Sequence, residues 1–212
     1  MLVQKFHTGM RLGQHPTLTK TNTLFFTRQG NWDGGSPLHC VAMALALLGK
    51  LADPCHLPCH GTGSESIMWN AAWPHYLHGL TLSELTSFIS ELNLGVKPVT
   101  CQGSPREILQ FSLRELTGNS PVIVGWRQRH PVTAHAALAI GIEGRQAGRA
   151  FDPHALLLLD PAGNEPDMAG FNARLDRHGA RQVHYCSPGD IRKVVLEGAV
   201  SLRLILNGIA GA

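Results

Sequence analysis

Five residues of this sequence have the types, and the order along the chain, that nucleophilic attack on a carbonyl group needs. Ser36 and Cys40 lie at the start of an expected helix, where the positive end of the helix dipole favours an ionised nucleophile. His135 opens an apolar stretch and Asp160 closes the next one, which supplies an imidazole base and a carboxylate to orient it. Gln29 precedes the helix and offers a side-chain amide as an oxyanion donor. Together they predict an acyl-transfer centre.

The same segments resemble those of a known family. Residues 29–49 read Gln…Asp-Gly-Gly-Ser-x-x-x-Cys-Val-Ala-Met-Ala-Leu…Gly, which is similar to the start of the bacterial peptidases that cleave double-glycine leaders, Gln…Asp-Cys-Gly-x-x-x-x-Ala-Met…Gly. Residues 135–141 and 156–163 look like that family's His-strand-Gly and strand-Asp-Pro-x-x-Gly segments, and the PVIVGW strand before them is similar as well. The resemblance covers roughly residues 29–165. It implies a papain-like cysteine peptidase that cuts a peptide or small protein.

One departure from the family pattern concerns the nucleophile. When the helix is aligned by Ala42, Met43 and Gly49, the family's cysteine falls on Ser36, and Cys40 lies one turn farther along. Three explanations are open, in this order. Ser36 replaces a natural cysteine and inactivates the enzyme; the protein is a pseudoenzyme; or Cys40 is the nucleophile and the alignment is shifted. Burial inside an apolar helix makes a thiol harder to ionise, and a hydroxyl ionises less readily than a thiol, which favours the first explanation.

A peptide substrate needs a groove beside the nucleophile. The segment 29–35, QGNWDGG, is a glycine-rich turn directly before the helix, and an aromatic segment follows at 69–78. In a peptidase both segments can line the groove, so we expect substrate contacts from Trp32, Asp33, Gly34, Gly35, Trp69 and Trp73.

A metal site is the competing interpretation of the loop Cys55-His-Leu-Pro-Cys59-His60. Two thiols and two imidazoles within six residues could ligate zinc, but no second ligand pair stands at a matching distance. Haem attachment fits less well, because three residues separate the two cysteines instead of two. We expect a structural loop, with no metal and no cofactor.

Helix signals precede strand signals along the chain. Ser36 with Pro37 begins an apolar helix that ends at Gly49, and the capping boxes at Thr81–Glu84 and Ser104–Glu107 begin two amphipathic helices. Expected strands cover residues 121–126, 135–143, 155–160 and 201–206, with a further helix near 189–197. This order predicts an α+β fold of the papain-like type, with the central N-terminal helix packed on an antiparallel sheet. An N-terminal arm is expected at 1–28 and the peptidase domain at 29–212, with a helical part at about 36–118 and a sheet part at about 121–207.

Composition narrows the class of protein. The chain has 212 residues, 43% of them hydrophobic and 16% charged, and no apolar run of about 18 residues, so we expect a soluble domain without a membrane span. The net charge of +3 is scattered, which argues against nucleic acid as a partner. The start of the chain lacks a secretion signal, and five cysteines do not form a disulfide pattern, so a cytoplasmic location is expected, with export by a dedicated secretion system as the alternative.

The residues therefore lead to one function and two alternatives. The first is a cysteine peptidase-like hydrolase with Ser36 at the nucleophile position, acting on a peptide or protein substrate. The second is an inactive module that binds a peptide or a partner protein. The third is a zinc-binding protein that uses the 55–60 loop.

Overall fold

The computed structural model describes residues 1–30, 34–127, 134–178 and 182–205. Helices lie mainly in the first half of the chain: α1 Ser36–Leu47, α2 Gly63–Ala72, α3 Leu82–Glu91 and α4 Pro105–Thr117, with short 3-10 turns η1 Leu57–Cys59 and η2 Trp73–His75. The strands are β1 Leu2–Phe6, β2 Met10–Arg11, β3 Thr17–Leu18, β4 Val96–Cys101, β5 Val122–Arg127, β6 Ala134–Ala147, β7 Ala150–Leu159, β8 Ala173–His178, β9 Gln182–Ser187 and β10 Asp190–Leu204.

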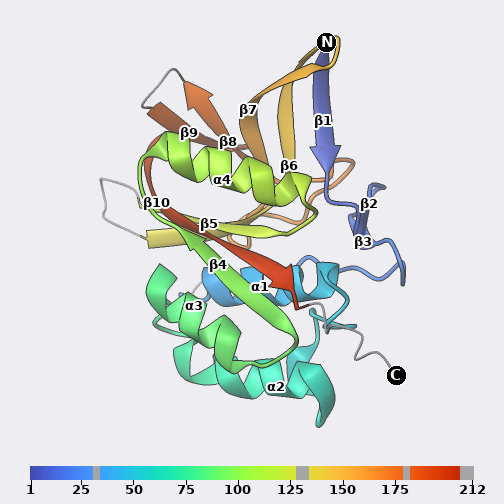
Figure 1. Cartoon of the computed structure of the whole chain (residues 1–212). Helices are drawn as coiled ribbons and strands as arrows, with labels where there is room; N and C mark the ends of the chain where they lie inside the picture. Colours follow the sequence, from blue (N-terminus) through green and yellow to red (C-terminus); the bar gives the residue numbers. More distant parts are fainter. Residues whose placement is uncertain (31–33, 128–133, 179–181, 206–212) are drawn as a thin grey trace, which may run out of the picture.

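The expected papain-like fold, with a helix packed on an antiparallel sheet, is wrong. Within the described residues, six antiparallel strands follow one another in the order β6-β5-β10-β9-β8-β7, and β7 pairs again with β6, which closes a barrel. β1 extends this sheet beside β6, and β4 extends it beside β10 (Figure 1). The molecule is therefore mostly a closed β-barrel with a few helices.

Two long strands make this closure possible. β6 pairs with β5 through residues 134–139 and with β7 through residues 138–147, and its register against β7 shifts at two places, next to Gly141 and Gly144. β10 shifts its register against β5 between Leu196 and Gly198. Such irregularities bend a strand and increase its twist. Each of the two strands can therefore pair with different neighbours along its length as the barrel curves.

The barrel has its own hydrophobic interior. Along β5, Val122, Val124 and Trp126 belong to the interior cluster, whereas Ile123 belongs to a second cluster that includes α1. This alternation is expected when both faces of a strand are covered by different layers. The interior cluster also takes in the buried face of α4, with Ile108, Phe111 and Leu116.

The second cluster lies between the outside of the barrel and the helices. α1 contacts β6 and β5, and of its residues only His39 is not buried. A helix that is apolar all round needs cover on all sides. α2 and α3 lie below α1 in Figure 1 and complete this helical layer. α1 is thus held firmly, with its first turn against β6.

Several expected elements are confirmed and one is wrong. α1, α3 and α4 begin where the sequence predicts, and both capping boxes are formed, at Thr81–Glu84 and Ser104–Glu107. The helix expected near 189–197 is instead the first part of β10. In that stretch Val194 and Leu196 are buried and their neighbours are more exposed, so the hydrophobic period is two and the segment forms a hairpin with β9. The division of the chain at residue 28 stays a prediction, although β1, from the expected arm, is part of the main sheet.

Candidate active site

A histidine and an aspartate meet at one end of the barrel. His135 is the second residue of β6 and Asp160 follows the last residue of β7, and these strand ends are neighbours because Leu138 pairs with Leu159. The His135 Nε2 atom lies 2.7 Å from Asp160 Oδ1. Asp160 is 1% exposed. Since Nε2 is engaged by the carboxylate, Nδ1 is the ring nitrogen that remains to accept a proton from a nucleophile.

The carboxylate of Asp160 is fixed by three donors. Besides His135, the Tyr185 hydroxyl donates to Oδ2 at 2.6 Å and the Ala162 amide donates to Oδ1 at 2.9 Å. Burial by itself raises the pKa of Asp160, but the hydrogen bonds and the charge of His135, with those from Tyr185 and Ala162, outweigh it, so the pKa lies below its usual value. Asn172 holds the Asp160 backbone through bonds to its N–H and its carbonyl oxygen. The side chain is thus kept ionised and immobile.

Ser36 is the first residue of α1 and lies against the same strand. The backbone N–H of Ala136 donates to Ser36 Oγ at 3.2 Å. Gly35 is the N-cap residue, and it supplies no side-chain cap to this helix. The hydroxyl therefore lies at the positive end of the α1 dipole, beside a donor from the strand that carries His135. It is also largely enclosed, since Ser36 is only 4% exposed.

Cys40 is placed quite differently. It is completely buried in the cluster around α1. Burial raises the pKa of its thiol well above the ordinary value, and the negative charge of Asp160 raises it further. A thiol that stays protonated and has no access to solvent is a poor nucleophile. The structure thus brings Ser36, His135 and Asp160 together and leaves Cys40 in the core.

A cleft of about 680 Å³ opens beside Ser36 and His135. Its lining comes from the start of α1, the 78–85 segment at the start of α3, Gly125 on β5 and Glu197 on β10. This volume is in the range of small-molecule and peptide side-chain sites. The cleft therefore gives a substrate access to the two side chains from the side of the helical layer.

The cleft rim is closed by an unusually tight backbone contact. Gly34 donates its N–H to the Tyr76 carbonyl at 3.2 Å, and a Cβ atom on Gly79 would collide with the Gly34 carbonyl oxygen. Gly79 also has a φ of +69°, which L-residues with side chains rarely adopt. The glycine-rich turn before α1 is thus fitted to the 76–79 turn.

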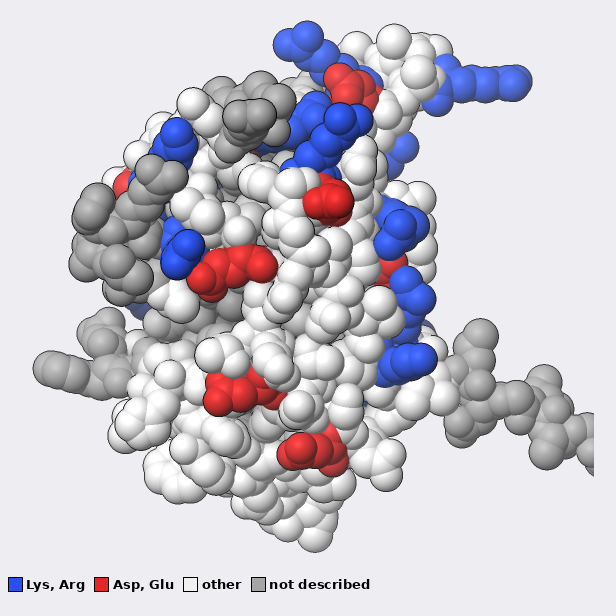
Figure 2. All heavy atoms as spheres, turned by 60° about the vertical axis from the view of Figure 1, so that its left-hand side comes forward, with Lys and Arg blue, Asp and Glu red and all other residues white. Residues whose placement is uncertain are grey.

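Charge is distributed unevenly over the face of the molecule that Figure 2 shows. Figure 2 shows Lys and Arg side chains on the upper part of this face and along its right edge, while only Asp and Glu are coloured at the bottom, over the helical layer. In agreement, residues 51–96 contain no Lys or Arg but include Asp53, Glu65, Glu84 and Glu91. None of these four carboxylates lines the cleft, and among the described lining residues the one acidic side chain is Glu197 on β10.

The other predicted site residues are spread over several places. Gln29 donates its backbone N–H to the Pro161 carbonyl at 3.0 Å, which ties it to the residue after Asp160. Its side-chain oxygen is buried and has no hydrogen-bond partner among the described residues. Gln29 does not line the cleft as the described residues form it. Trp32 and Asp33 lie outside the described residues. Gly34 lines the cleft and Gly35 caps α1.

The two predicted tryptophans lie in a separate aromatic cluster. Trp69 and Trp73 contact each other with ring centroids 5.3 Å apart, and both contact Tyr76. Trp69 lines a second hollow together with Tyr76 and His39, on the other side of the 76–79 turn from the cleft. Trp73 is 63% exposed. Neither tryptophan is therefore part of the cleft.

Sequence reasoning missed the residues that support the dyad from inside the barrel. Tyr185 comes from β9, which the sequence analysis did not identify, and Trp126 packs its ring edge-on to His135 with the centroids 5.1 Å apart. Trp126 also contacts Tyr185, with the two ring centroids 5.4 Å apart. The residues of β9 do not stand out in the sequence, because the alternation of exposed and buried positions in residues 182–187 is visible only in the structure.

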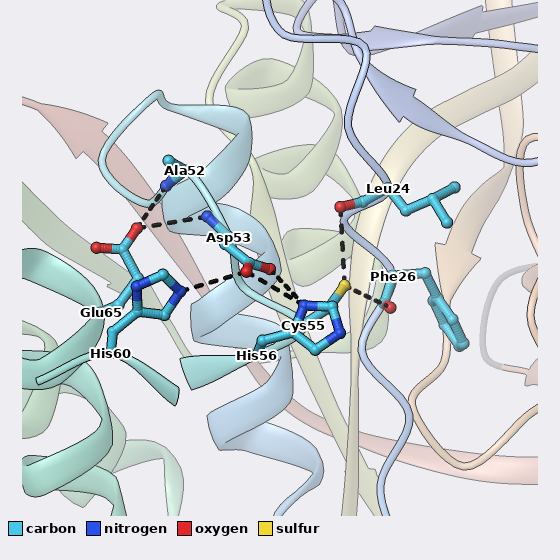
Figure 3. Close-up of polar contacts among 8 residues, drawn as sticks. All are labelled: Leu24, Phe26, Ala52, Asp53, Cys55, His56, His60 and Glu65. Atoms are coloured by element: carbon cyan, nitrogen blue, oxygen red, sulfur yellow. Dashed lines mark hydrogen bonds and ion pairs between the residues drawn. The ribbon is translucent and has the colours of Figure 1, made fainter. Parts of the chain in front are cut away.

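The proposed zinc ligands of the 55–60 loop separate into two groups. His56 Nδ1 lies 3.0 Å from Asp53 Oδ1, and His60 Nε2 lies 3.2 Å from Asp53 Oδ2 (Figure 3). The Cys55 thiol points away from these rings, toward the carbonyl oxygens of Leu24 and Phe26. Burial, together with the charge of Asp53 and a second carboxylate, raises the Cys55 pKa to about 11. In the part of the chain that the structure describes, no group of three or more His, Cys, Asp or Glu side chains is arranged to hold a metal ion.

Comparisons with known proteins do not assign this chain to a family. No protein-family model and no curated protein sequence matches this chain. None of the described helices combines the length and the apolar character needed to cross a membrane.

Proposed function

We propose that the chain is a hydrolase-like protein of the nucleophile–histidine–aspartate class, that its substrate is a peptide or small protein, and that residue 36 is the attacking position. The observation that carries the proposal is the contact of 2.7 Å between His135 and an almost fully buried Asp160. Perturbed, paired titratable groups beside a cleft are typical of catalytic sites. Ser36 lies next to this dyad through its bond from Ala136.

The proposed chemistry assigns one task to each group. The nucleophile at position 36 loses its proton to His135 Nδ1 and forms a bond to the substrate carbonyl carbon. The imidazolium then gives that proton to the leaving amine, while Asp160 stabilises the positive ring. Water hydrolyses the acyl intermediate by the same route. Gln29 remains the proposed oxyanion donor through its side-chain NH2 group, and its backbone is tied to Pro161, the residue after Asp160.

A serine at position 36 makes the sequence as printed a weak catalyst. A thiolate forms easily near neutral pH at a helix start, whereas a hydroxyl needs a base at the moment of attack. We therefore expect full activity only with cysteine at this position. The cytoplasm is the proposed location, where the free thiols of the chain would stay reduced.

The test is gain of peptide hydrolysis by Ser36→Cys. Peptides with an internal Gly-Gly bond and a cationic or neutral flank are incubated with the protein, and new termini are identified by mass spectrometry. Ser64→Cys is the matched control, because Ser64 also lies in the first turn of a helix, α2, but does not line the cleft that Ser36 and His135 share. We expect cleavage by Ser36→Cys and none by Ser64→Cys or by Ser36→Cys with His135→Ala. A folded Ser36→Cys protein that cuts no peptide would contradict the proposal.

A second candidate function is peptide binding without cleavage. It is favoured by the state of Ser36, because this residue is 4% exposed and its hydroxyl already accepts a hydrogen bond from Ala136. In this case calorimetry detects binding of the same peptides to the chain as printed, and Ser36→Cys adds no cleavage. The two functions are thus separated by one pair of measurements.

A further inference from the structure

Tyr185 approaches the dyad from inside the barrel. It lies on β9, is 4% exposed, and its hydroxyl donates to Asp160 Oδ2 at 2.6 Å. His135 holds the other oxygen, Oδ1, at 2.7 Å. The two side chains therefore share one carboxylate. A stronger hydrogen bond from Tyr185 to Asp160 weakens the interaction of Asp160 with His135.

The tyrosine stays a donor over the whole useful pH range. Burial, the charge of Asp160 and the hydrogen bond to it all raise the pKa of Tyr185 far above its ordinary value. A phenol that keeps its proton can only donate to the aspartate. Each donor to a carboxylate lowers the negative charge available to the next, so Tyr185 weakens the attraction of Asp160 for a proton on His135.

The other groups around the dyad are few. From β5, Trp126 packs its ring on both His135 and Tyr185. From α1, the Cys40 thiol is buried and protonated, and the Ser36 hydroxyl is uncharged. From β10, the Arg192 guanidinium lies 4.7 Å over the Tyr185 ring and pairs with Asp190. On β9 itself, Ser187 opposes part of the rise in the Tyr185 pKa. Among the described residues, Asp160 is thus the charged group in direct contact with His135.

We propose that Tyr185 is a positioning residue of this site: by holding Oδ2 of Asp160 it fixes the carboxylate that orients the imidazole of His135 and limits how strongly that carboxylate binds the protonated ring. Its catalytic meaning rests on the proposed function. The coupling itself is independent of turnover, because a hydrogen-bonded aspartate affects the histidine whether or not a substrate is cut.

The first test follows the His135 ring by NMR as the pH is changed. Tyr185→Phe removes only the hydroxyl, so Asp160 attracts the His135 proton more strongly and the titration midpoint of the ring moves up by about half a pH unit. Tyr76→Phe is a matched control, since Tyr76 is the only other tyrosine and its hydroxyl faces His39 instead of the dyad. An unchanged midpoint in Tyr185→Phe, or an equal change in Tyr76→Phe, overturns the proposal.

The second test needs no change at Tyr185. In the Tyr76→Phe protein the remaining tyrosine is Tyr185, so ultraviolet absorbance reports its ionisation alone. We expect no phenolate below about pH 11, and ionisation at lower pH when Asp160→Asn removes the negative charge. Phenolate at the ordinary pH of a free tyrosine, with Asp160 present, refutes the coupling.

The two proposals fail in different ways. If Ser36→Cys cuts nothing but both tyrosine tests succeed, the proposed hydrolysis is wrong and the Tyr185–Asp160–His135 coupling stands. If Ser36→Cys is active, the alkaline limb of its pH–rate profile, where the imidazolium partner of the thiolate loses its proton, should move to higher pH with Tyr185→Phe. An active enzyme whose profile does not move contradicts the positioning role.

Discussion

The backbone N–H of Ala136 donates to Ser36 Oγ, so β6 reaches the first turn of α1 one residue after it presents His135. A sulfur atom at position 36 would meet the same N–H, the helix dipole and the imidazole. All three stabilise a thiolate. We expect the thiol of Ser36→Cys to have a pKa at least about one unit below that of Ser64→Cys. The measurement is the rate of iodoacetamide alkylation against pH, with the modified peptide identified by mass spectrometry. Equal midpoints for the two thiols would contradict this account of the site.

Asp160 should matter for both stability and activity. Asp160→Ala leaves the buried hydroxyl of Tyr185 and the N–H of Ala162 without their acceptor, and we expect it to cost about 2–4 kcal/mol of unfolding free energy. Asp160→Asn keeps one oxygen acceptor, so it should cost less, about 1 kcal/mol. In the Ser36→Cys background both changes should lower peptide hydrolysis by about 100-fold or more. Urea titrations and steady-state rates measure the two effects. Equal unfolding free energies of Asp160→Ala and Asp160→Asn would contradict the expectation that an oxygen acceptor for Tyr185 and Ala162 stabilises the fold.

The contact between the turns at Gly34 and Gly79 predicts a steric effect that can be separated from backbone strain. Gly79→Ala places a Cβ atom against the Gly34 carbonyl oxygen and keeps a positive φ. Gly49 has nearly the same φ, +70°, but nothing lies within 4 Å of a Cβ atom there. Gly49→Ala should therefore cost only the strain, about 1 kcal/mol, and Gly79→Ala should cost at least about 2 kcal/mol. Thermal unfolding of both variants tests the difference, and equal losses would show that the contact is not required.

His7 should make stability depend on pH. Its Nδ1 accepts the Gly9 N–H at 3.0 Å, so Nε2 carries the proton and donates to the Asn119 carbonyl at 2.9 Å. Burial lowers the pKa of His7 below 6.5 and outweighs the opposite effect of the Asn119 bond. The folded state thus favours neutral His7. The stabilising contribution of neutral His7 to folding is complete above about pH 6.5. It is lost as the pH falls through the lowered pKa of His7 in the folded protein. We expect stability to fall more steeply on acidification in the parent than in His7→Gln. Parallel curves would contradict this assignment.

Local signals in the sequence were reliable where one segment decides the structure by itself. Thr81 and Ser104 each begin a helix, because the capping box involves only residues three apart. Ser36 begins α1 for a similar reason, with Pro37 next to it. The strands at 121–126 and 155–160 were also visible as short apolar runs.

Closure of the barrel could not be predicted in the same way. It depends on the pairing of β6 with β7 and on register shifts beside Gly141 and Gly198, which are decided by contacts between distant strands. The stretch 189–197 shows the same limit. It contains polar residues at spacings that fit a helix. It forms a strand because Val194 and Leu196, two residues apart, are both buried in the barrel interior.

The three main residues of the candidate site could be predicted from their order along the chain, but the residues that hold them in place could not. Ser36, His135 and Asp160 were found because each follows or opens a recognisable element, and the structure brings them together. Tyr185 lies on a strand without a clear pattern and acts from the opposite side of the carboxylate. Trp69 and Trp73 were assigned to the groove from their aromatic type and their place in the sequence, but neither lines the cleft, and Trp69 lines a second hollow.

Successive residues of β6 face different layers of the molecule. The ring of His135 contacts Trp126 of the barrel interior, and Ala136 belongs to the cluster around α1. A slip of β6 by one position would exchange these faces, turning the imidazole into the helical core and leaving Asp160 without its histidine partner. The pairing register of this strand is therefore itself a condition for function, and any insertion or deletion between its bulges and His135 should abolish the site even if every side chain named above is kept.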